Sequence, residues 1–249
     1  MTDPHRKIGI KQTIQKEWMD RTVRMMLAGL TETEIRVELD QYLATQKPSG
    51  GTGERGQKTY GMAIAVLASW FAPNRELCAF VDDAKKLAKT ISQDQWLPLH
   101  WAVISASYPF WFNVAKQVGR LLNLQHQVTQ LQIFNRLKEQ YGDRETVARN
   151  ARYAVRSLIA WGVLNDTSVK GAYTKGNQIT VHETEVAILL YEAALLTLEE
   201  KKSPLAGIAN NPAFFPFQIL TVSGEVIAQR SSRIEVTRYG LDDEVLQRK

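Results

Sequence analysis

The chain has 249 residues, of which 44% are hydrophobic and 23% charged, and its formal net charge is +5. These values are typical of a soluble globular protein with one large domain or two small ones. The single cysteine, Cys78, excludes an internal disulfide and favours a cytoplasmic location. The N-terminus is polar, so we expect no signal peptide, and every apolar stretch is interrupted, so we expect no membrane span.

The first half of the chain is expected to be almost entirely helical. A first helix is expected over 12–28 and ends at Gly29. Thr31 and Glu34 then form a capping box, in which each side chain accepts a backbone N–H of the other residue, at the start of a helix reaching residue 44. Four more helices are expected over 59–71, 73–89, 97–106 and 109–122. Cys78 lies in one of them and is expected to be a small core residue.

A glycine-rich stretch over 48–56 is expected to be a loop. Gly51 and Gly56 bracket four residues and a lysine follows soon after, which is close to a phosphate-binding loop. One residue is inserted before that lysine, however, and the preceding element is expected to be a helix instead of the buried strand that such a loop needs. ATP binding is therefore disfavoured, and the alternative is a loop that orders on DNA, with Arg55 and Lys58 contacting phosphate.

Aromatic residues are densest between residues 96 and 112, where the sequence has Trp96, Trp101, Tyr108, Phe110, Trp111 and Phe112. We expect this aromatic cluster to form the seam between the helical part and the segment that follows. Stacking of single-stranded bases is the alternative, but the basic residues that would follow a nucleic-acid backbone are sparse here.

Residues 128–181 carry the most informative pattern, which begins with a short helix and a tight turn. Thr129 and Gln132 form a second capping box, so a helix should begin near Gln130. Gly142 can adopt the positive φ that commonly ends a helix. The region from 101 to 185 also holds ten basic and six acidic residues, so much of the net positive charge lies around this segment.

A second, arginine-rich helix is expected over 144–161, beginning with Arg144. Its core side is formed by apolar residues spaced three and four apart, namely Val147, Ala151, Ala154, Val155, Leu158 and Ile159. The opposite side carries Arg149, Arg152, Tyr153 and Arg156. Arginine can grip phosphate or a guanine edge with two hydrogen bonds, so we predict DNA contact; a solvated charged face, with Glu145 as its one nearby acidic partner, is the alternative.

A β-hairpin is expected after this helix. Gly162 ends the helix, residues 163–164 form a first strand and residues 178–181 a returning strand. Lys170 and Lys175 would lie at the tip of the hairpin, where they could contact phosphate or the minor groove. Helix, turn, arginine-rich helix and hairpin are together typical of a winged helix-turn-helix, although an ordinary surface hairpin would show the same lysines.

The rest of the chain is expected to add an apolar helix over 184–200, an aromatic turn over 211–217 and strands over 218–222 and 234–238. The predicted fold is mainly α: a helical bundle with a winged helix-turn-helix module and a few short β-strands. We divide it into an N-terminal helical domain (1–123), the winged module (124–200) and a C-terminal extension that packs on the rest (201–249).

Catalytic and metal-binding patterns find little support. The four histidines His5, His100, His126 and His182 are scattered without the spacing of metal ligands, and His100 in its apolar helix is expected to be a hydrogen-bonded core residue. The adjacent aspartate pairs 82–83 and 242–243 are expected to be solvated charge. No acid–base or nucleophile arrangement is evident, so we expect neither an enzyme nor a cofactor.

The order of these motifs resembles the BrxA family of BREX bacteriophage-defence systems. The resemblance rests on Leu-Ala-Gly-Leu-Thr-Glu-Thr-Glu-Ile at 27–35, on Tyr108-Pro109-Phe110 after an apolar helix, and on the arginine-rich helix that leads to Trp-Gly-Val-Leu at 161–164. It spans roughly residues 12–181, whereas the glycine-rich stretch and the chain beyond Val181 depart from the family pattern. It implies a small DNA-binding protein that acts beside larger components with methyltransferase and ATPase chemistry, and it carries Tyr108 and Pro109 over as structural positions.

The sequence therefore predicts a non-catalytic subunit of a BREX-type defence system that binds double-stranded DNA and other defence proteins. One alternative is a protein-interaction scaffold, with the aromatic turn around Phe214, Phe215 and Phe217 as its anchor, since aromatic residues are enriched at interface hot spots. Another is a winged-helix transcriptional regulator.

Overall fold

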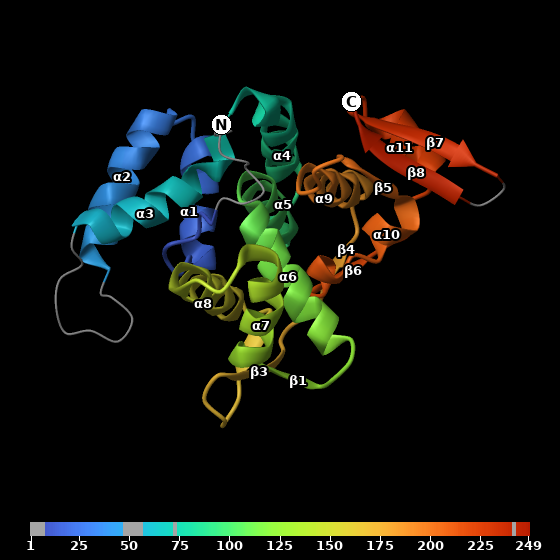
Figure 1. Cartoon of the computed structure of the whole chain (residues 1–249). Coiled ribbons are helices and arrows are strands. Elements are labelled where there is room, and N and C mark those ends of the chain that lie inside the picture. Colours follow the sequence, from blue (N-terminus) through green and yellow to red (C-terminus); the bar gives the residue numbers. More distant parts are fainter. Residues whose placement is uncertain (1–7, 47–56, 72–73, 241–242) are drawn as a thin grey trace.

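A computed structural model of the chain describes residues 8–46, 57–71, 74–240 and 243–249 (Figure 1). Within these residues the fold is mainly α, with eleven α-helices and eight short strands in three small sheets. The prediction of a mainly helical fold with a few short strands is confirmed at this level. One cluster of buried hydrophobic residues runs from Ile10 to Leu246 and includes residues from almost every element.

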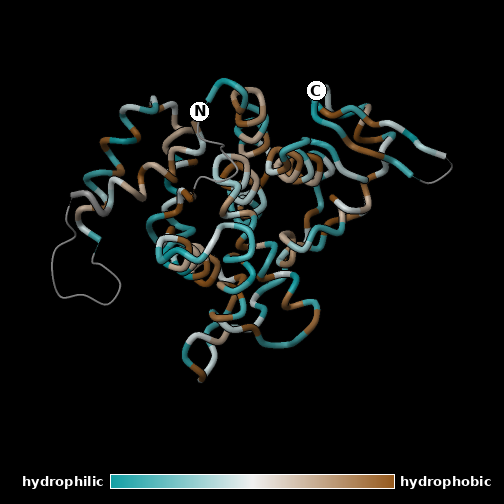
Figure 2. Tube along the Cα trace, in the orientation of Figure 1, coloured by the Kyte–Doolittle hydropathy of each residue, from teal (hydrophilic) through white to brown (hydrophobic). Residues whose placement is uncertain are grey.

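The N-terminal part consists of α1 (Lys16–Leu27), α2 (Glu32–Thr45), α3 (Gln57–Leu67), the 3-10 helices η2 (Ala68–Phe71) and η3 (Arg75–Leu77), and α4 (Cys78–Thr90). The capping box of Thr31 and Glu34 is present as predicted. Helix α2 has both hydrophilic and hydrophobic residues along its length (Figure 2). Only Ile35, Leu39 and Leu43 of this outer helix are buried. The Cys78 prediction is wrong: this residue is exposed, since it begins α4 on the side away from the buried Phe80.

The centre of the fold is formed by η4 (Gln93–Gln95), α5 (Leu97–Ser107), α6 (Pro109–Leu122) and α9 (Thr184–Leu196). Helix α5 is buried on every side over residues 97–106, as is α9 over 186–196, and the two pack against each other. Their sequences are apolar all round for this reason.

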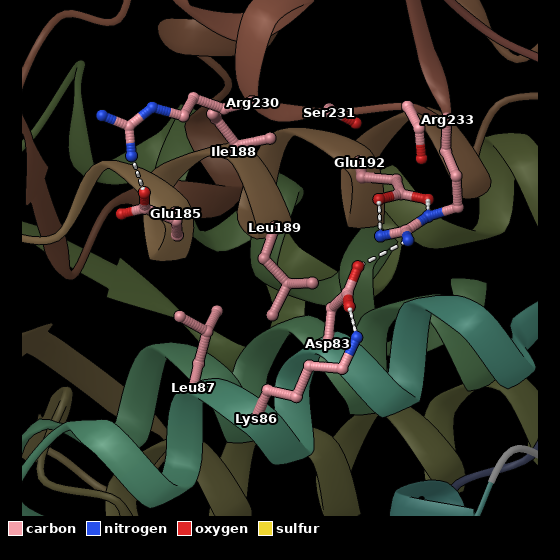
Figure 3. Close-up of a pocket in the computed structure, with 11 residues that line it drawn as sticks. Asp83, Lys86, Leu87, Glu185, Ile188, Leu189, Glu192, Arg230, Ser231 and Arg233 are labelled. Atoms are coloured by element: carbon pink, nitrogen blue, oxygen red, sulfur yellow. Dashed lines mark hydrogen bonds and ion pairs between the residues drawn. The ribbon is translucent and has the colours of Figure 1, made fainter.

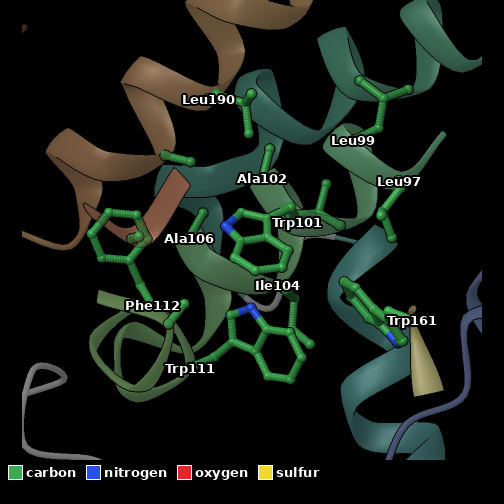
Figure 4. Packing of buried hydrophobic residues seen from close by; sticks show 14 of the residues in the cluster. Leu97, Leu99, Trp101, Ala102, Ile104, Ala106, Trp111, Phe112, Trp161 and Leu190 are labelled. Carbon is green, nitrogen blue, oxygen red and sulfur yellow. The ribbon is translucent and has the colours of Figure 1, made fainter. Parts of the chain in front are cut away.

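The aromatic cluster lies inside the protein (Figure 4). The rings of Trp101 on α5, Trp111 on α6 and Trp161 at the end of α8 lie 5.0–6.1 Å apart between centroids, and all three side chains are buried. The cluster thus joins the helical part to the arginine-rich helix, as expected for a seam. Stacking on single-stranded bases would require exposed ring faces, which these tryptophans do not offer.

The segment after α6 contains β1 (Gln127–Thr129), α7 (Gln130–Tyr141), α8 (Glu145–Ala160), β2 (Leu164–Asp166) and β3 (Ala172–Lys175). These elements gather at the lower end of the molecule in Figure 1, away from the strands near the C-terminus. The two predicted helices are confirmed to within one residue at each end. The predicted hairpin partner 178–181 is wrong, because the strand that returns beside β2 is β3.

The remaining strands and helices are β4 (Ile179–Val181), β5 (Lys202–Pro204), α10 (Leu205–Ala209), η5 (Pro212–Phe214), β6 (Phe217–Ile219), α11 (Gly224–Arg230), β7 (Ile234–Tyr239) and β8 (Asp243–Arg248). Strand β4 pairs in parallel with β6, and β5, β8 and β7 form an antiparallel sheet in that order. Both predicted C-terminal strands exist, at slightly different bounds. Strands β5 and β8 and helices α10 and α11 were not predicted.

The aromatic turn is buried against α6. Phe214 and Phe215 are only 4% and 7% exposed, and Phe214 meets the ring of Phe112 at a centroid distance of 5.9 Å. The contact is so close that a Cβ on Gly119 would lie 1.8 Å from the carbonyl oxygen of Pro212, so only glycine fits there. The hypothesis that this turn anchors a partner protein is therefore wrong, because its rings hold the C-terminal part onto α6.

A junction of ion pairs also attaches the C-terminal part (Figure 3). Arg233 donates two hydrogen bonds to Glu192 of α9, at 2.7 and 2.8 Å, and one to Asp83 of α4, at 2.5 Å. Lys86 pairs with Asp83, and Arg230 with Glu185. These residues line a cavity of about 260 Å³, but its charged groups already have partners of opposite sign within the protein. We interpret the junction as structural.

His100 is a hydrogen-bonded core residue, as predicted. Its Nδ1 accepts from the indole N–H of Trp70 at 3.3 Å, so its Nε2 carries the proton and donates to Asp20 at 2.8 Å. Burial lowers the pKa of His100 in spite of the nearby Asp20 carboxylate, so the imidazole is neutral. Burial opposes ionisation of Asp20, but the hydrogen bonds from His100 and Lys16 outweigh it and lower its pKa.

We expect the free energy of unfolding to fall as the pH drops below the ordinary histidine pKa of 6.5. In that range the unfolded chain binds a proton at residue 100 and the folded protein does not, so acid favours unfolding. Urea unfolding at pH 7.5 and pH 5.5 measures the effect. His100→Gln should lose most of the pH dependence, whereas His126→Gln, at an exposed histidine, should keep it.

Candidate nucleic-acid interface

A three-stranded antiparallel sheet supports the candidate interface. Its order is β1-β3-β2, with Val128 opposite Tyr173 and Asp166 opposite the same tyrosine on the other side. Burial raises the pKa of Tyr173, so its hydroxyl stays protonated and donates to the side-chain oxygen of Gln130 at 3.2 Å. The N–H of Gln130 donates to the carbonyl oxygen of Gly171 at 2.7 Å. The hairpin is thus fixed to the start of α7.

The turn between α7 and α8 is short and well determined. Helix α7 begins with the predicted capping box, in which the N–H of Thr129 donates to Gln132 at 2.8 Å and the N–H of Gln132 to the Thr129 hydroxyl at 3.2 Å. It ends at Gly142, whose φ of +79° is the positive value expected there. Only residues 142–144 separate the two helices.

Helix α8 is held firmly by its buried side. The predicted core residues are buried from Val147 to Leu158, with Asn150 and Ser157 buried among them, and the last of them, Ile159, is partly buried. The Ser157 hydroxyl accepts the N–H of Ile14 at 2.8 Å, and the indole N–H of Trp161 donates to the Ile14 carbonyl oxygen at 3.0 Å. The segment before α1 therefore fixes the orientation of α8, and with it the orientation of the opposite face.

That opposite face carries three exposed guanidinium groups. Arg149, Arg152 and Arg156 follow one another at spacings of three and four residues, which brings them to one side of the helix. Arg144 is exposed at the N-terminal end of α8 and donates to the Tyr141 carbonyl oxygen at 2.9 Å. Tyr153 differs from the prediction, since its ring is partly buried against the core.

The arginines differ in their ion pairs. Arg156 donates two hydrogen bonds to the carboxylate of Asp166 on β2, at 2.8 and 2.9 Å, with both side chains about half exposed. Arg149 lies 3.8 Å from Glu145, and Arg152 has no ion-pair partner among the residues that the structure describes. The expectation that Glu145 is the one acidic partner is therefore wrong. Asp166 was missed because it meets Arg156 only once β2 folds back beside α8.

The two hairpin lysines do not lie together. Lys170 is in the exposed turn between β2 and β3, beside the exposed Val169. Lys175 ends β3 and lies opposite Leu164, at the base of the hairpin next to the end of α8. The prediction that both occupy the tip is wrong for Lys175, because the returning strand is β3 and not residues 178–181.

Two other residues predicted to contact DNA lie wholly or in part outside the described part of the structure. Arg55 and the side chain of Lys58 lie outside the described residues, as does most of the glycine-rich stretch. Sequence reasoning also passed over Arg136, an exposed arginine on α7 that lies 3.9 Å from Glu139. Its signal was present, since it sits opposite the apolar stripe of α7.

Within the described parts of the chain, no group of three or more histidine, cysteine, aspartate or glutamate side chains could hold a metal ion. Over the same residues, no helix is long and apolar enough to span a membrane. Comparison of the chain with protein-family models, curated protein sequences and solved structures finds no match.

Proposed function

We propose that residues 109–175 form a winged helix-turn-helix that binds double-stranded DNA with α8. The support is the order of the elements: α6, β1, α7, α8, β2 and β3, with the strands in the order β1-β3-β2. In such modules the second helix after the first strand enters the major groove and the hairpin acts as the wing. Lys170 in the hairpin turn and Arg144 at the start of α8 are the expected flanking phosphate contacts.

The observation that carries the proposal is the exposed arginine face of α8 on a helix fixed by its other side. The major groove is about 12 Å wide and admits an α-helix. Arginines along such a helix can reach base edges and phosphates on both walls. A rigid helix loses little conformational entropy on binding, which favours affinity.

We extend the proposal to a non-catalytic, DNA-binding subunit of a BREX-type defence system, in company with other defence proteins. This part rests on the sequence resemblance alone. Deleting the gene from a phage-resistant host that carries such a system should abolish resistance, and the Arg149/Arg152/Arg156 alanine variant should fail to restore it. Full restoration by the variant would argue against a role for DNA binding in defence.

The direct test is fluorescence anisotropy of a labelled random duplex titrated with the protein over a series of salt concentrations. We expect binding at low salt, with an affinity that falls as salt rises by a slope of about 0.9 for each phosphate neutralised. A protein that leaves the anisotropy unchanged at the lowest salt would contradict the proposal.

Asp166→Asn is expected to tighten duplex binding several-fold. The substitution removes a negative charge beside the proposed groove-facing helix and frees the guanidinium of Arg156 from its carboxylate partner. Asp94→Asn, at an exposed aspartate far along the chain, changes the net charge equally and serves as the control. Equal gains in the two variants would show that only net charge matters.

A further inference from the structure

A second cavity lies between α6, the end of α7 and the turn after α9. Its volume is about 370 Å³, and three cations line it, Lys116 and Arg120 from α6 and Lys202 from β5. The amides of Gln117 and Gln140 also reach it, and Glu199 and Glu200 stand at the turn. The size is within the range of small-molecule sites in proteins.

The charged groups of the Arg233 junction have partners of opposite charge, but in the part of the chain that the structure describes two cations of this second cavity do not. Among the described residues, neither Lys116 nor Arg120 has a carboxylate within ion-pair distance. The two lie one helical turn apart on α6, so they repel each other. Burial, and secondarily the charge of Arg120, lowers the pKa of Lys116, which means that the folded protein holds this cation at a cost.

Gln117 gives an independent indication. This residue is only 7% exposed overall, and it lines the cavity. Its side-chain amide makes no hydrogen bond among the described residues and is not one of their buried unpaired atoms, so the amide is accessible from the cavity. An amide in this position can hydrogen-bond to a ligand, or to water that a ligand displaces.

We infer that this cavity binds the phosphoryl group of a small anionic ligand, with Lys116 and Arg120 neutralising its charge and the Gln117 amide donating to one of its oxygens. Two unpaired cations and an unpaired donor are the chemistry that a phosphoryl group recognises. Glu199 and Glu200 border the same cavity from the turn after α9, so the phosphoryl group would lie on the side formed by α6. The cavity has the volume of a small-molecule site, so we take the ligand to be a small molecule and not nucleic acid. This inference is independent of the proposed DNA interface.

Calorimetric titration with inorganic pyrophosphate, beside thermal melting, tests the inference. We expect binding and a raised melting temperature in the wild-type protein. Lys116→Met should weaken binding by about tenfold or more, the loss expected for one charge-assisted hydrogen bond. Because it removes a half-buried charge that desolvation disfavours, the same variant should melt no lower than wild type without ligand, so weaker binding could not be attributed to misfolding. Lys89→Met, at an exposed lysine of α4, should bind as the wild-type protein does.

Two outcomes would overturn the inference. One is that pyrophosphate does not bind to or stabilise the wild-type protein, or that it stabilises the Lys116→Met protein as much as wild type. The other is displacement of bound pyrophosphate by duplex DNA in wild type and in the Arg149/Arg152/Arg156 alanine variant alike, because the cavity would then hold a nucleic-acid phosphate. Retention of pyrophosphate in the presence of duplex supports a small-molecule site.

Discussion

Replacing Arg149, Arg152 and Arg156 together by alanine is expected to weaken duplex DNA binding by about 100-fold or more. Each arginine is a charge-assisted donor, and a bidentate contact to a base contributes about 1–3 kcal/mol of discrimination. The dependence of affinity on salt should also flatten, because the slope falls by about 0.9 for each phosphate that the protein no longer neutralises. Anisotropy titrations of wild type and variant over the same salt series measure both quantities.

The fold should survive this triple substitution. All three side chains are exposed, and alanine favours helix at least as strongly as arginine does. The contacts that hold α8 come from its other side, through Ser157 and Trp161. An unchanged circular dichroism spectrum and a urea midpoint close to that of wild type would confirm this.

A matched control separates the α8 face from net charge. Arg24, Arg36 and Arg75 are exposed on α1, α2 and η3, and their triple alanine variant carries the same change in charge. We expect it to lose only a few-fold in affinity, since distant charges act through the screened field of the whole protein. Equal losses in the two triple variants would contradict a DNA contact by α8.

Local signals made most of the helices predictable from sequence. The capping boxes at Thr31 and Thr129 and the positive-φ Gly29 and Gly142 act within a few residues, and the structure has all four. The buried and exposed sides of α8 follow from helical periodicity alone. The predicted arginine face therefore needed no information from distant parts of the chain.

The pairing of the strands and the ion pairs depended on how separate elements pack together. A strand forms in the predicted segment 178–181, over residues 179–181, but it pairs with β6 about 38 residues later. Nothing in the alternation of its residues selects that partner over β2. The Arg156–Asp166 pair and the burial of the Phe214 turn on Gly119 arise in the same way, from tertiary contacts. The exposed position of Cys78 also depends on which side of α4 faces the core.

Arg233→Ala is expected to lower the free energy of unfolding by about 3 kcal/mol. Removing one partner of a buried ion pair leaves the other as an uncompensated buried charge, which typically costs about 3–5 kcal/mol. Here Glu192 is only 1% exposed, but Arg248 remains 3.6 Å from it, so the lower end of the range applies. The substitution also removes the ion pair between Arg233 and Asp83 of α4. Urea unfolding of the two proteins measures the difference.

Two further variants show that the buried charge is the cause. Adding Glu192→Gln to Arg233→Ala should recover about 1 kcal/mol or more, because a neutral amide is less costly to bury alone than a carboxylate. Arg36→Ala breaks an exposed pair with Glu32 and should cost less than about 1 kcal/mol. If Arg233→Ala cost no more than Arg36→Ala, the junction would contribute little, and the attachment of the C-terminal part would rest on the Phe214 turn against α6. If the double variant were less stable than Arg233→Ala, the carboxylate of Glu192 would be stabilised mainly by Arg248.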